Sequence, residues 1–169
     1  MDALILSCST GGGHDSAAKA IRDEMKRRGH RALVLNPYEL VSEKLAGVID
    51  NGYVSMAKYT PLCFGAVYQA GELFRNFPFH SPVYFANSGM VSPMNRFLSD
   101  GNWDVIFTTH VYPGEILANM KRRGIPVPKT VMISTDYACT PFIEESDCDA
   151  YVTPAPDLDY DFFRRGIPL

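Results

Sequence analysis

The first 35 residues of the chain follow the order strand, glycine-rich turn, helix and strand, which restricts the possible folds more than any other feature. Residues 3–8 (ALILSC) are an apolar run typical of a strand buried on both faces. Apolar residues at helical spacing follow up to Gly29, and residues 31–35 (RALVL) are predicted to form a second strand. Two strands joined by a helix within so short a stretch indicate a βαβ unit and therefore a parallel sheet.

The same alternation returns after residue 100. We predict strands at 103–110 (WDVIFTTH), 129–136 (KTVMISTD) and 149–155 (DAYVTPA), with a helix from Pro113 to Arg123 and a last helix that ends at Gly166. Residues 38–100 contain helical patches broken by prolines and no convincing strand. The predicted fold class is α/β: one Rossmann-like domain over 1–169, an open parallel sheet with flanking helices and a helical, aromatic-rich insertion at about 38–100.

Composition excludes several classes of protein. The formal net charge is −3 and no long run of either sign occurs, which argues against a broad nucleic-acid footprint. Four cysteines without a C-x-x-C pair indicate reduced thiols in a cytoplasmic protein. No apolar stretch of about 18 residues is present, and Asp2 stands where a secretory signal carries Lys or Arg. No cluster of His, Cys and Asp has metal-ligand spacing, so we expect neither a metal nor a cofactor.

Polar side chains gather where three of the predicted strands end. The motifs are STGGGH, TTH and STDY, and the carboxyl ends of parallel strands meet at one edge of a sheet, where ligands of such folds bind. These residues are therefore expected to share one rim: Ser9, Thr10, His14, Thr108, Thr109, His110, Ser134, Thr135 and Asp136.

The glycine loop, Gly11, Gly12 and Gly13, has two interpretations. Three residues without a Cβ allow a positive φ and let a ligand approach the backbone closely, beside the positive end of the following helix. Alternatively, the glycines make a tight turn and Asp15 or Ser16 caps the helix. No G-K-[ST] follows, and Ser16 stands where a dinucleotide fingerprint has its third glycine, so neither nucleotide motif applies.

His14 is the first candidate for chemistry, because the helix dipole favours an uncharged imidazole, the state that a general base requires. His110 could contact a ligand or could simply bond to the backbone at a strand end. Asp136 could orient a substrate hydroxyl or the His14 ring, or could cap a turn. No G-x-S-x-G elbow supports a serine hydrolase, although a small hydrolase or phosphatase that uses His14 and Asp136 remains an alternative.

Four motifs, in this order, resemble the amino-terminal domain of the monogalactosyldiacylglycerol synthase family, which includes the processive diacylglycerol glucosyltransferases. They are STGGGHDSAAKAI, DVIFTTHVYPGEIL, TVMISTDYACTPF and DAYVTPAPDLDYDFFRRGIP. The resemblance implies the amino-terminal half of a GT-B glycosyltransferase, in which this domain binds the lipid acceptor and touches the membrane. A carboxy-terminal domain, absent from these residues, binds the nucleotide-sugar, so the chain alone is expected to turn over little substrate.

The resemblance further implies inverting transfer of a hexose from a nucleotide-sugar such as a UDP-sugar to the hydroxyl of diacylglycerol, with His14 as the base and no metal. The implied location is the inner face of the cell membrane, as a peripheral protein. Two features depart from the family pattern: Thr140 and Phe142 stand near positions where many members have His and then Trp, and the chain stops at RRGIPL. A non-catalytic module that binds a phosphate or a lipid headgroup is the alternative function. The residues expected to contact the acceptor or a phosphate are Ser9, Thr10, Gly11, Gly12, Gly13, Thr109, His110 and Tyr137.

The aromatic segment at residues 53–85 has two accounts of equal weight. In one, its side chains dip into the membrane interface and receive acyl chains, with Lys58 and Arg75 near headgroups. In the other, they pack on the sheet as core. The candidates for membrane or acyl-chain contact are Tyr59, Leu62, Phe64, Tyr68 and Phe74.

Overall fold

The computed structural model describes residues 1–74 and 79–168, and within them the side chains of all residues except Tyr53, Met56, Ala57, Pro61, Cys63, Phe64 and Val67. Five parallel strands form one sheet in the order β2-β1-β3-β4-β5. The strands are β1 (Asp2–Leu6), β2 (Arg31–Leu35), β3 (Val105–Thr108), β4 (Lys129–Ile133) and β5 (Ala150–Val152). The predicted α/β class with a Rossmann-like parallel sheet is confirmed.

The strands end earlier than the sequence predicts. Their predicted carboxyl ends at Cys8, His110 and Asp136 lie in loops, because the paired registers end at Leu6, Thr108 and Ile133. Among the described residues, only one further backbone hydrogen bond to a neighbouring strand follows in each case, from Ser7, Thr109 and Ser134. The polar residues that leave the sheet here are the ones expected on the rim.

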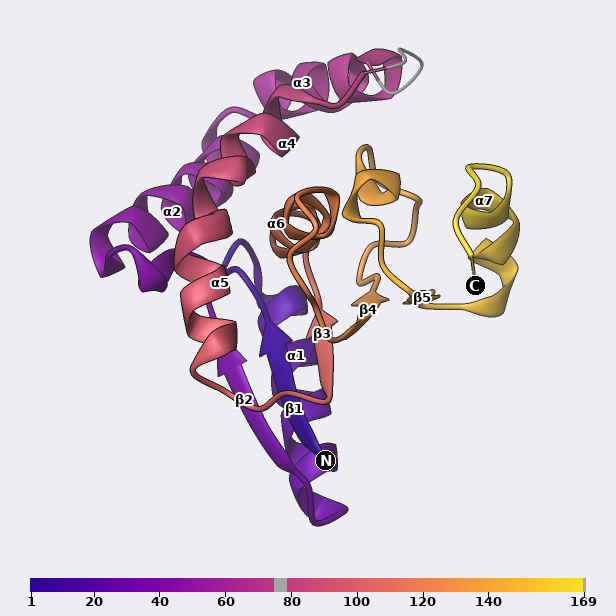
Figure 1. The fold of residues 1–169 in the computed structure, drawn as a ribbon. Helices are drawn as coiled ribbons and strands as arrows, with labels where there is room; N and C mark the ends of the chain where they lie inside the picture. Colours follow the sequence, from indigo (N-terminus) through magenta and orange to yellow (C-terminus); the bar gives the residue numbers. More distant parts are fainter. Residues whose placement is uncertain (75–78, 169) are drawn as a thin grey trace.

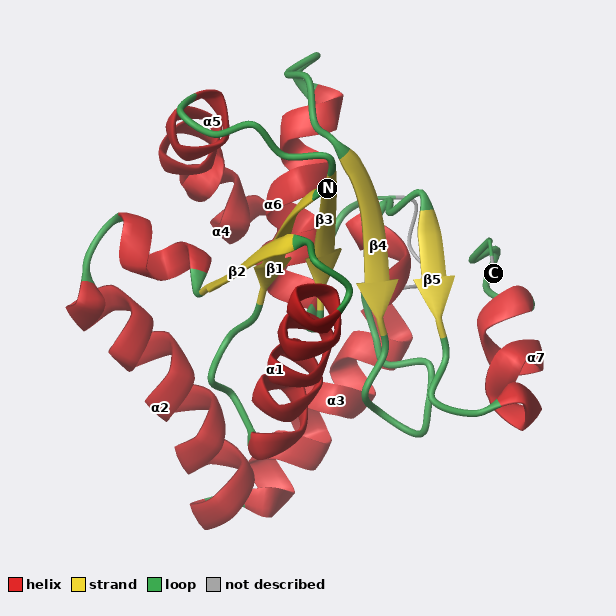
Figure 2. Ribbon diagram, turned by 90° about the horizontal axis from the view of Figure 1, so that it is seen from below, coloured by secondary structure: helices red, strands yellow, loops and turns green. Residues whose placement is uncertain are grey.

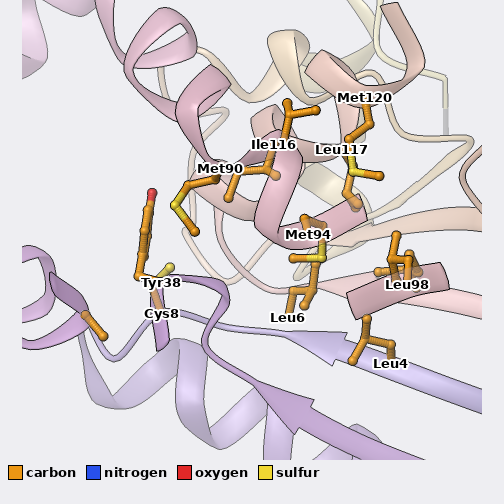
Figure 3. Packing of buried hydrophobic residues seen from close by; sticks show 13 residues of the cluster. Leu4, Leu6, Cys8, Tyr38, Met90, Met94, Leu98, Ile116, Leu117 and Met120 are labelled. Atoms are coloured by element: carbon orange, nitrogen blue, oxygen red, sulfur yellow. The ribbon is translucent and has the colours of Figure 1, made fainter. Parts of the chain in front are cut away.

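Helices cover both faces of the sheet (Figure 2). On one face lies α1 (Gly12–Arg27), which packs along β1 and β2. On the other lie α5 (Val91–Ser99) and α6 (Val111–Arg122), whose side chains meet the strand residues that point toward them. Figure 3 shows this core, in which Leu4 and Leu6 of β1 pack with Met94, Leu98 and Leu117.

The segment between β2 and β3 is helical throughout the part that the structure describes. It contains η1 (Pro37–Leu40), α2 (Glu43–Tyr59), α3 (Pro61–Phe74), α4 (Pro82–Asn87), η2 (Ser88–Met90) and α5. Prolines begin α3 and α4, where a missing backbone N–H costs nothing. Figure 1 shows α2 and α3 beyond the end of the sheet at which the strand arrows point.

The last segment completes the far edge of the sheet. After β4 come η3 (Ile143–Ser146) and β5, then η4 (Pro156–Leu158) and α7 (Asp159–Phe163). A second, smaller core forms here around the fully buried ring of Phe162, with Met132, Ile143, Tyr151 and Ile167 packed together. No helix in the described parts of the chain is long and apolar enough to cross a bilayer.

Candidate functional site

The candidate site lies at the one place in the sheet where the chain order reverses direction. From β1 the chain passes through α1 to β2 on one side, and later returns to β3 on the other side of β1. The loops after β1 and β3 therefore diverge to opposite faces and leave a crevice between them, the usual ligand site of open parallel sheets. The glycine loop follows β1, and His110 follows β3.

His14 is held by contacts with two other loops. Its Nδ1 lies 2.6 Å from the backbone oxygen of Thr109 and 2.9 Å from Oγ1 of Thr135. A carbonyl oxygen can only accept a hydrogen bond, so Nδ1 carries a proton and donates it to Thr109. In the neutral ring Nε2 is then the nitrogen that can accept a proton, as a general base must.

His110 is buried and stays neutral. It is 6% exposed, and its Nδ1 accepts a hydrogen bond from the backbone N–H of Tyr112, which caps the amino end of α6. Burial, with a smaller effect from the charge of His14, lowers the pKa of His110 to about 3. Its ring meets the His14 ring edge-on, with centroids 4.7 Å apart. This cap also explains why α6 begins at Val111 and not at the predicted Pro113.

The structure contradicts one part of the turn interpretation of the three glycines, the capping of α1 by Asp15 or Ser16. None of the three has a φ in the left-handed region, and the residue that caps α1 is Gly11, without any side-chain hydrogen bond from Asp15 or Ser16. A Cβ added at any of the three would meet nothing within 4 Å. The glycines thus leave an open space beside the amino end of a sixteen-residue helix.

Hydrogen bonds between polar side chains hold the residues on either side of the glycine loop. Oγ1 of Thr109 donates to Oγ of Ser7 (3.0 Å), which in turn donates to Asp15 of α1 (3.3 Å). Ser9 is exposed, and its backbone lies near Asp50 of α2, whose Oδ2 accepts a hydrogen bond from the side-chain amide of Asn36 (2.9 Å). Burial and the neighbouring Asp15 raise the pKa of Asp50. Thr10 is buried, and its hydroxyl has no hydrogen-bond partner among the described residues.

Next to His14 the structure contains a pocket with a volume of about 240 Å³. One part is polar and consists of His14, Thr109, His110, Ser134, Thr135 and Asp136. The rest is mostly apolar and comes from five segments: Tyr68 of α3, Val83 of α4, Val111 and Tyr112 of α6, Met132 and Ile133 of β4, and Thr140, Pro141, Phe142 and Ile143 before and in η3. The pocket therefore offers a polar end with a candidate base and an apolar end.

Asp136 and Tyr137 take different positions from the other predicted site residues. Asp136 lines the pocket, but Nδ1 of His14 is held by Thr109 and Thr135, so Asp136 does not orient the imidazole through that nitrogen. Tyr137 is 80% exposed and does not line the pocket. Thr108 is buried and its hydroxyl donates to the backbone oxygen of His110, which shapes the loop that carries this histidine.

Four of the five residues predicted to contact the membrane have described side chains, and these four divide into two groups. Tyr59 and Leu62, on either side of the corner between α2 and α3, are 72% and 89% exposed. Tyr68 is half-buried and lines the pocket, and Phe74 packs edge-on against Phe79 and Phe142. The side chain of Phe64, like Arg75, lies outside what the structure describes. The helix α3 thus turns one face to the pocket and another to the solvent.

Several residues of the site carry no motif in the sequence. Thr135 belongs to the expected rim, but its contact with His14 requires the fold. Pro141 and Phe142 approach α3 closely at Gly71, where an added Cβ would lie 3.0 Å from Pro141. Asp50 lies in the helical segment, and only the packing of α2 brings it to the glycine loop.

Taken together, the sheet order and the pocket define a Rossmann-like α/β domain with a pocket at the carboxyl ends of its strands. Residues 14–169 match the model of the family described as monogalactosyldiacylglycerol (MGDG) synthase. The chain belongs to this family of glycolipid glycosyltransferases, as the amino-terminal domain of a GT-B enzyme. The match begins at His14, immediately after the three glycines. Comparison with curated proteins and with solved structures gives no match.

Proposed function

We propose that this chain is the acceptor-binding domain of an inverting glycosyltransferase that moves a hexose from a UDP-sugar to the hydroxyl of diacylglycerol or a related lipid. The observation that carries the proposal is the Nδ1 contact of His14 with the Thr109 carbonyl, which sets the tautomer of a general base beside the pocket. In the reaction Nε2 takes the proton of the acceptor hydroxyl as its oxygen attacks the anomeric carbon, and the nucleoside diphosphate leaves.

The charges around the pocket favour an uncharged acceptor over a phosphorylated ligand. Among the described residues that line the pocket none is Lys or Arg, whereas Asp136 is an acid. Asp15 and Asp50 flank the glycine loop as well. A phosphate monoester would meet these carboxylates without a cation to balance it. A hydroxyl group needs only a base and hydrogen-bond partners, and Thr109, Ser134 and Thr135 supply such partners.

The acceptor is proposed to reach the pocket from a membrane surface, with the protein bound peripherally on the inner face of the cell membrane. The support is the exposure of apolar side chains on α2 and α3, beyond the same end of the sheet as the pocket (Figure 1). Tyr59 and Leu62 lie three residues apart in the chain, at the exposed corner, and the amine of Lys58 lies 5.1 Å from the ring centroid of Tyr59. Such a mixture of apolar, aromatic and basic side chains is suited to a bilayer interface. The nucleotide-sugar would be bound chiefly by a second domain.

The role of His14 as the general base is tested by measuring sugar transfer. The protein used is this chain followed by the donor-binding domain of a member of the same family. His14→Ala should lower kcat by about 10²–10⁴-fold, the range of a lost general base. His30→Ala is the matched control, since His30 lies in the turn between α1 and β2, at the other end of the sheet. Unchanged transfer in His14→Ala would end the assignment of this base, and no transfer from a UDP-sugar by the unaltered protein would end the assignment of the reaction.

The membrane part is tested by flotation with vesicles of phosphatidylcholine and phosphatidylglycerol, with and without diacylglycerol. Leu62→Asp should lower the bound fraction severalfold, because burial of a Leu side chain stabilises by about 1.5–3 kcal/mol. Phe163→Asp replaces another exposed apolar side chain, on α7, and should leave binding unchanged. Binding that depends only on the anionic lipid, together with no effect of Leu62→Asp, would favour a headgroup-binding module instead.

A further inference from the structure

A buried acid lies on the far side of the pocket wall, in a helix that has almost no exposed surface. Glu115 of α6 is 0% exposed, and every residue of this helix from Pro113 to Met120 is buried. Its Oε2 accepts a hydrogen bond from the side-chain amide of Asn87 at the end of α4 (2.5 Å). Asn87 in turn accepts one from the hydroxyl of Tyr38 in η1 (2.5 Å). No Lys or Arg takes part in these contacts of Glu115.

The second oxygen of Glu115 faces another acid. Glu145 of η3 is within hydrogen-bonding range of Glu115, and no described residue donates to Oε1 of Glu115. Both oxygens of Glu145 already act as acceptors, from the backbone N–H of Ser81 (2.7 Å) and from its hydroxyl (2.5 Å). Two carboxyl groups can bond to each other only through a proton. Because Glu145 is used as a carboxylate, the proton belongs on Oε1 of Glu115.

This contact joins three parts of the pocket wall. Glu145 lies in η3, which begins at the pocket residue Ile143. Ser81 caps α4, whose Val83 also lines the pocket. Glu115 itself lies one turn after the amino end of α6, where His110 is the cap. A change in the contact between Glu115 and Glu145 would therefore separate η3 and α4 from α6.

We propose that Glu115 is a positioning residue of the pocket: as a neutral acid it donates a hydrogen bond to Glu145 and so holds η3 and α4 against α6. The other groups around the pair agree with this arrangement. Burial and the neighbouring Glu145 raise the pKa of Glu115, and the bond from Asn87 opposes this only in part. Further titratable or charged groups near the pair are His80, whose Nδ1 lies 3.6 Å from Glu145, and Tyr38, Tyr84 and Arg122.

The first test measures the proton by urea unfolding of the chain between pH 6.5 and 8. The unfolded state has released the Glu115 proton in this range, and the raised pKa lets the folded state retain it, so this group raises the unfolding equilibrium constant with rising pH, by up to about tenfold per pH unit. Glu115→Gln should remove this contribution, because an amide still donates to Glu145 but cannot ionise. Glu43→Gln, at an exposed position in α2, is the control and should behave as the unaltered chain. The same pH dependence in Glu115→Gln and the unaltered chain would overturn the proposal.

The second test measures the pocket wall by methyl NMR at pH 7, with Val83 and Ile143 as reporters. Glu115→Gln should leave their resonances in place, whereas Glu115→Ala, if it folds, should shift both. Shifts in Glu115→Gln as large as those in Glu115→Ala would show that the residue acts by shape alone and would also overturn the proposal. Neither test uses a sugar or a lipid. Failure of the proposed transferase function would therefore leave the outcome of these tests unaffected, and failure of these tests would leave the transferase proposal unaffected.

Discussion

Replacement of His110 by asparagine should change how the stability of the chain depends on pH. In the unfolded chain a histidine takes up a proton below about pH 6.5, but burial lowers the pKa of folded His110 to about 3. The folded state therefore binds fewer protons, and its stability is lost as the pH falls from 6.5 toward 3. The loss is about 1.4 kcal/mol per pH unit, or about 2 kcal/mol between pH 6.5 and pH 5.

Glu115 acts in the opposite direction over the same range. Its raised pKa means that the folded state keeps a proton which the unfolded state releases above about pH 4.5, so this contribution to stability falls as the pH rises. In the unaltered chain the two effects oppose each other between pH 5 and 6.5. His110→Asn removes the first of them, so the change in stability per pH unit should be lower than in the unaltered chain by up to about 1.4 kcal/mol.

The assay is urea unfolding at half-unit steps from pH 5 to 6.5. Asparagine is chosen because it also caps helices, so α6 keeps its amino end. Loss of the ring packing against His14 and Tyr112 shifts the stability at every pH alike, and only the slope is the readout. His30→Asn is the control. Equal slopes in His110→Asn and the unaltered chain would refute the argument that His110 is buried as a neutral ring.

Three further changes have expected outcomes of stated size. Thr135→Val removes one acceptor of the Nδ1–H of His14, a hydrogen bond worth about 0.5–1.5 kcal/mol, and should lower kcat of sugar transfer up to about tenfold with little change in KM. Gly114→Ala places a Cβ 2.5 Å from Cβ of Ser146, so urea unfolding should show a loss of about 1–3 kcal/mol; an unchanged stability would mean that η3 moves away freely. Phe162→Ala empties the centre of the second core and should cost about 3–5 kcal/mol by thermal unfolding.

The sequence predicts the sheet well because apolar runs bounded by Gly, Pro and polar residues are local signals. Residues 31–35 form β2 with the predicted bounds, and α6 ends one residue before the predicted Arg123 because Gly124 follows in a left-handed conformation. The carboxyl ends of the strands are predicted less accurately. Hydrogen bonding between strands depends on where the neighbouring strand ends. The residue types at positions 134–136 do not indicate where that is.

The sequence predicts the residues of the site only where they lie together in one loop. His14 and the glycines are adjacent in the sequence, and their special composition marks them. Thr135 holds the His14 ring from 121 residues away, and Asp50 reaches Ser9 through the packing of α2. The aromatic segment was ambiguous for a related reason: Leu62 and Tyr68 lie on the same helix, yet one is exposed and the other lines the pocket.

The helix α6 contains a signal that can be read in its sequence once its burial is known. A helix that is buried on all sides is normally apolar all round, but α6 carries Glu115 and Asn119 four residues apart, on one side. Both bond to α4, Glu115 through Asn87 and Asn119 through the backbone oxygen of Tyr84 (3.0 Å). With His110 neutral at its cap and Glu115 neutral within it, α6 places no net charge beside the pocket. This supports a hydroxyl acceptor, because a proton moved to His14 is then not opposed by a neighbouring cation.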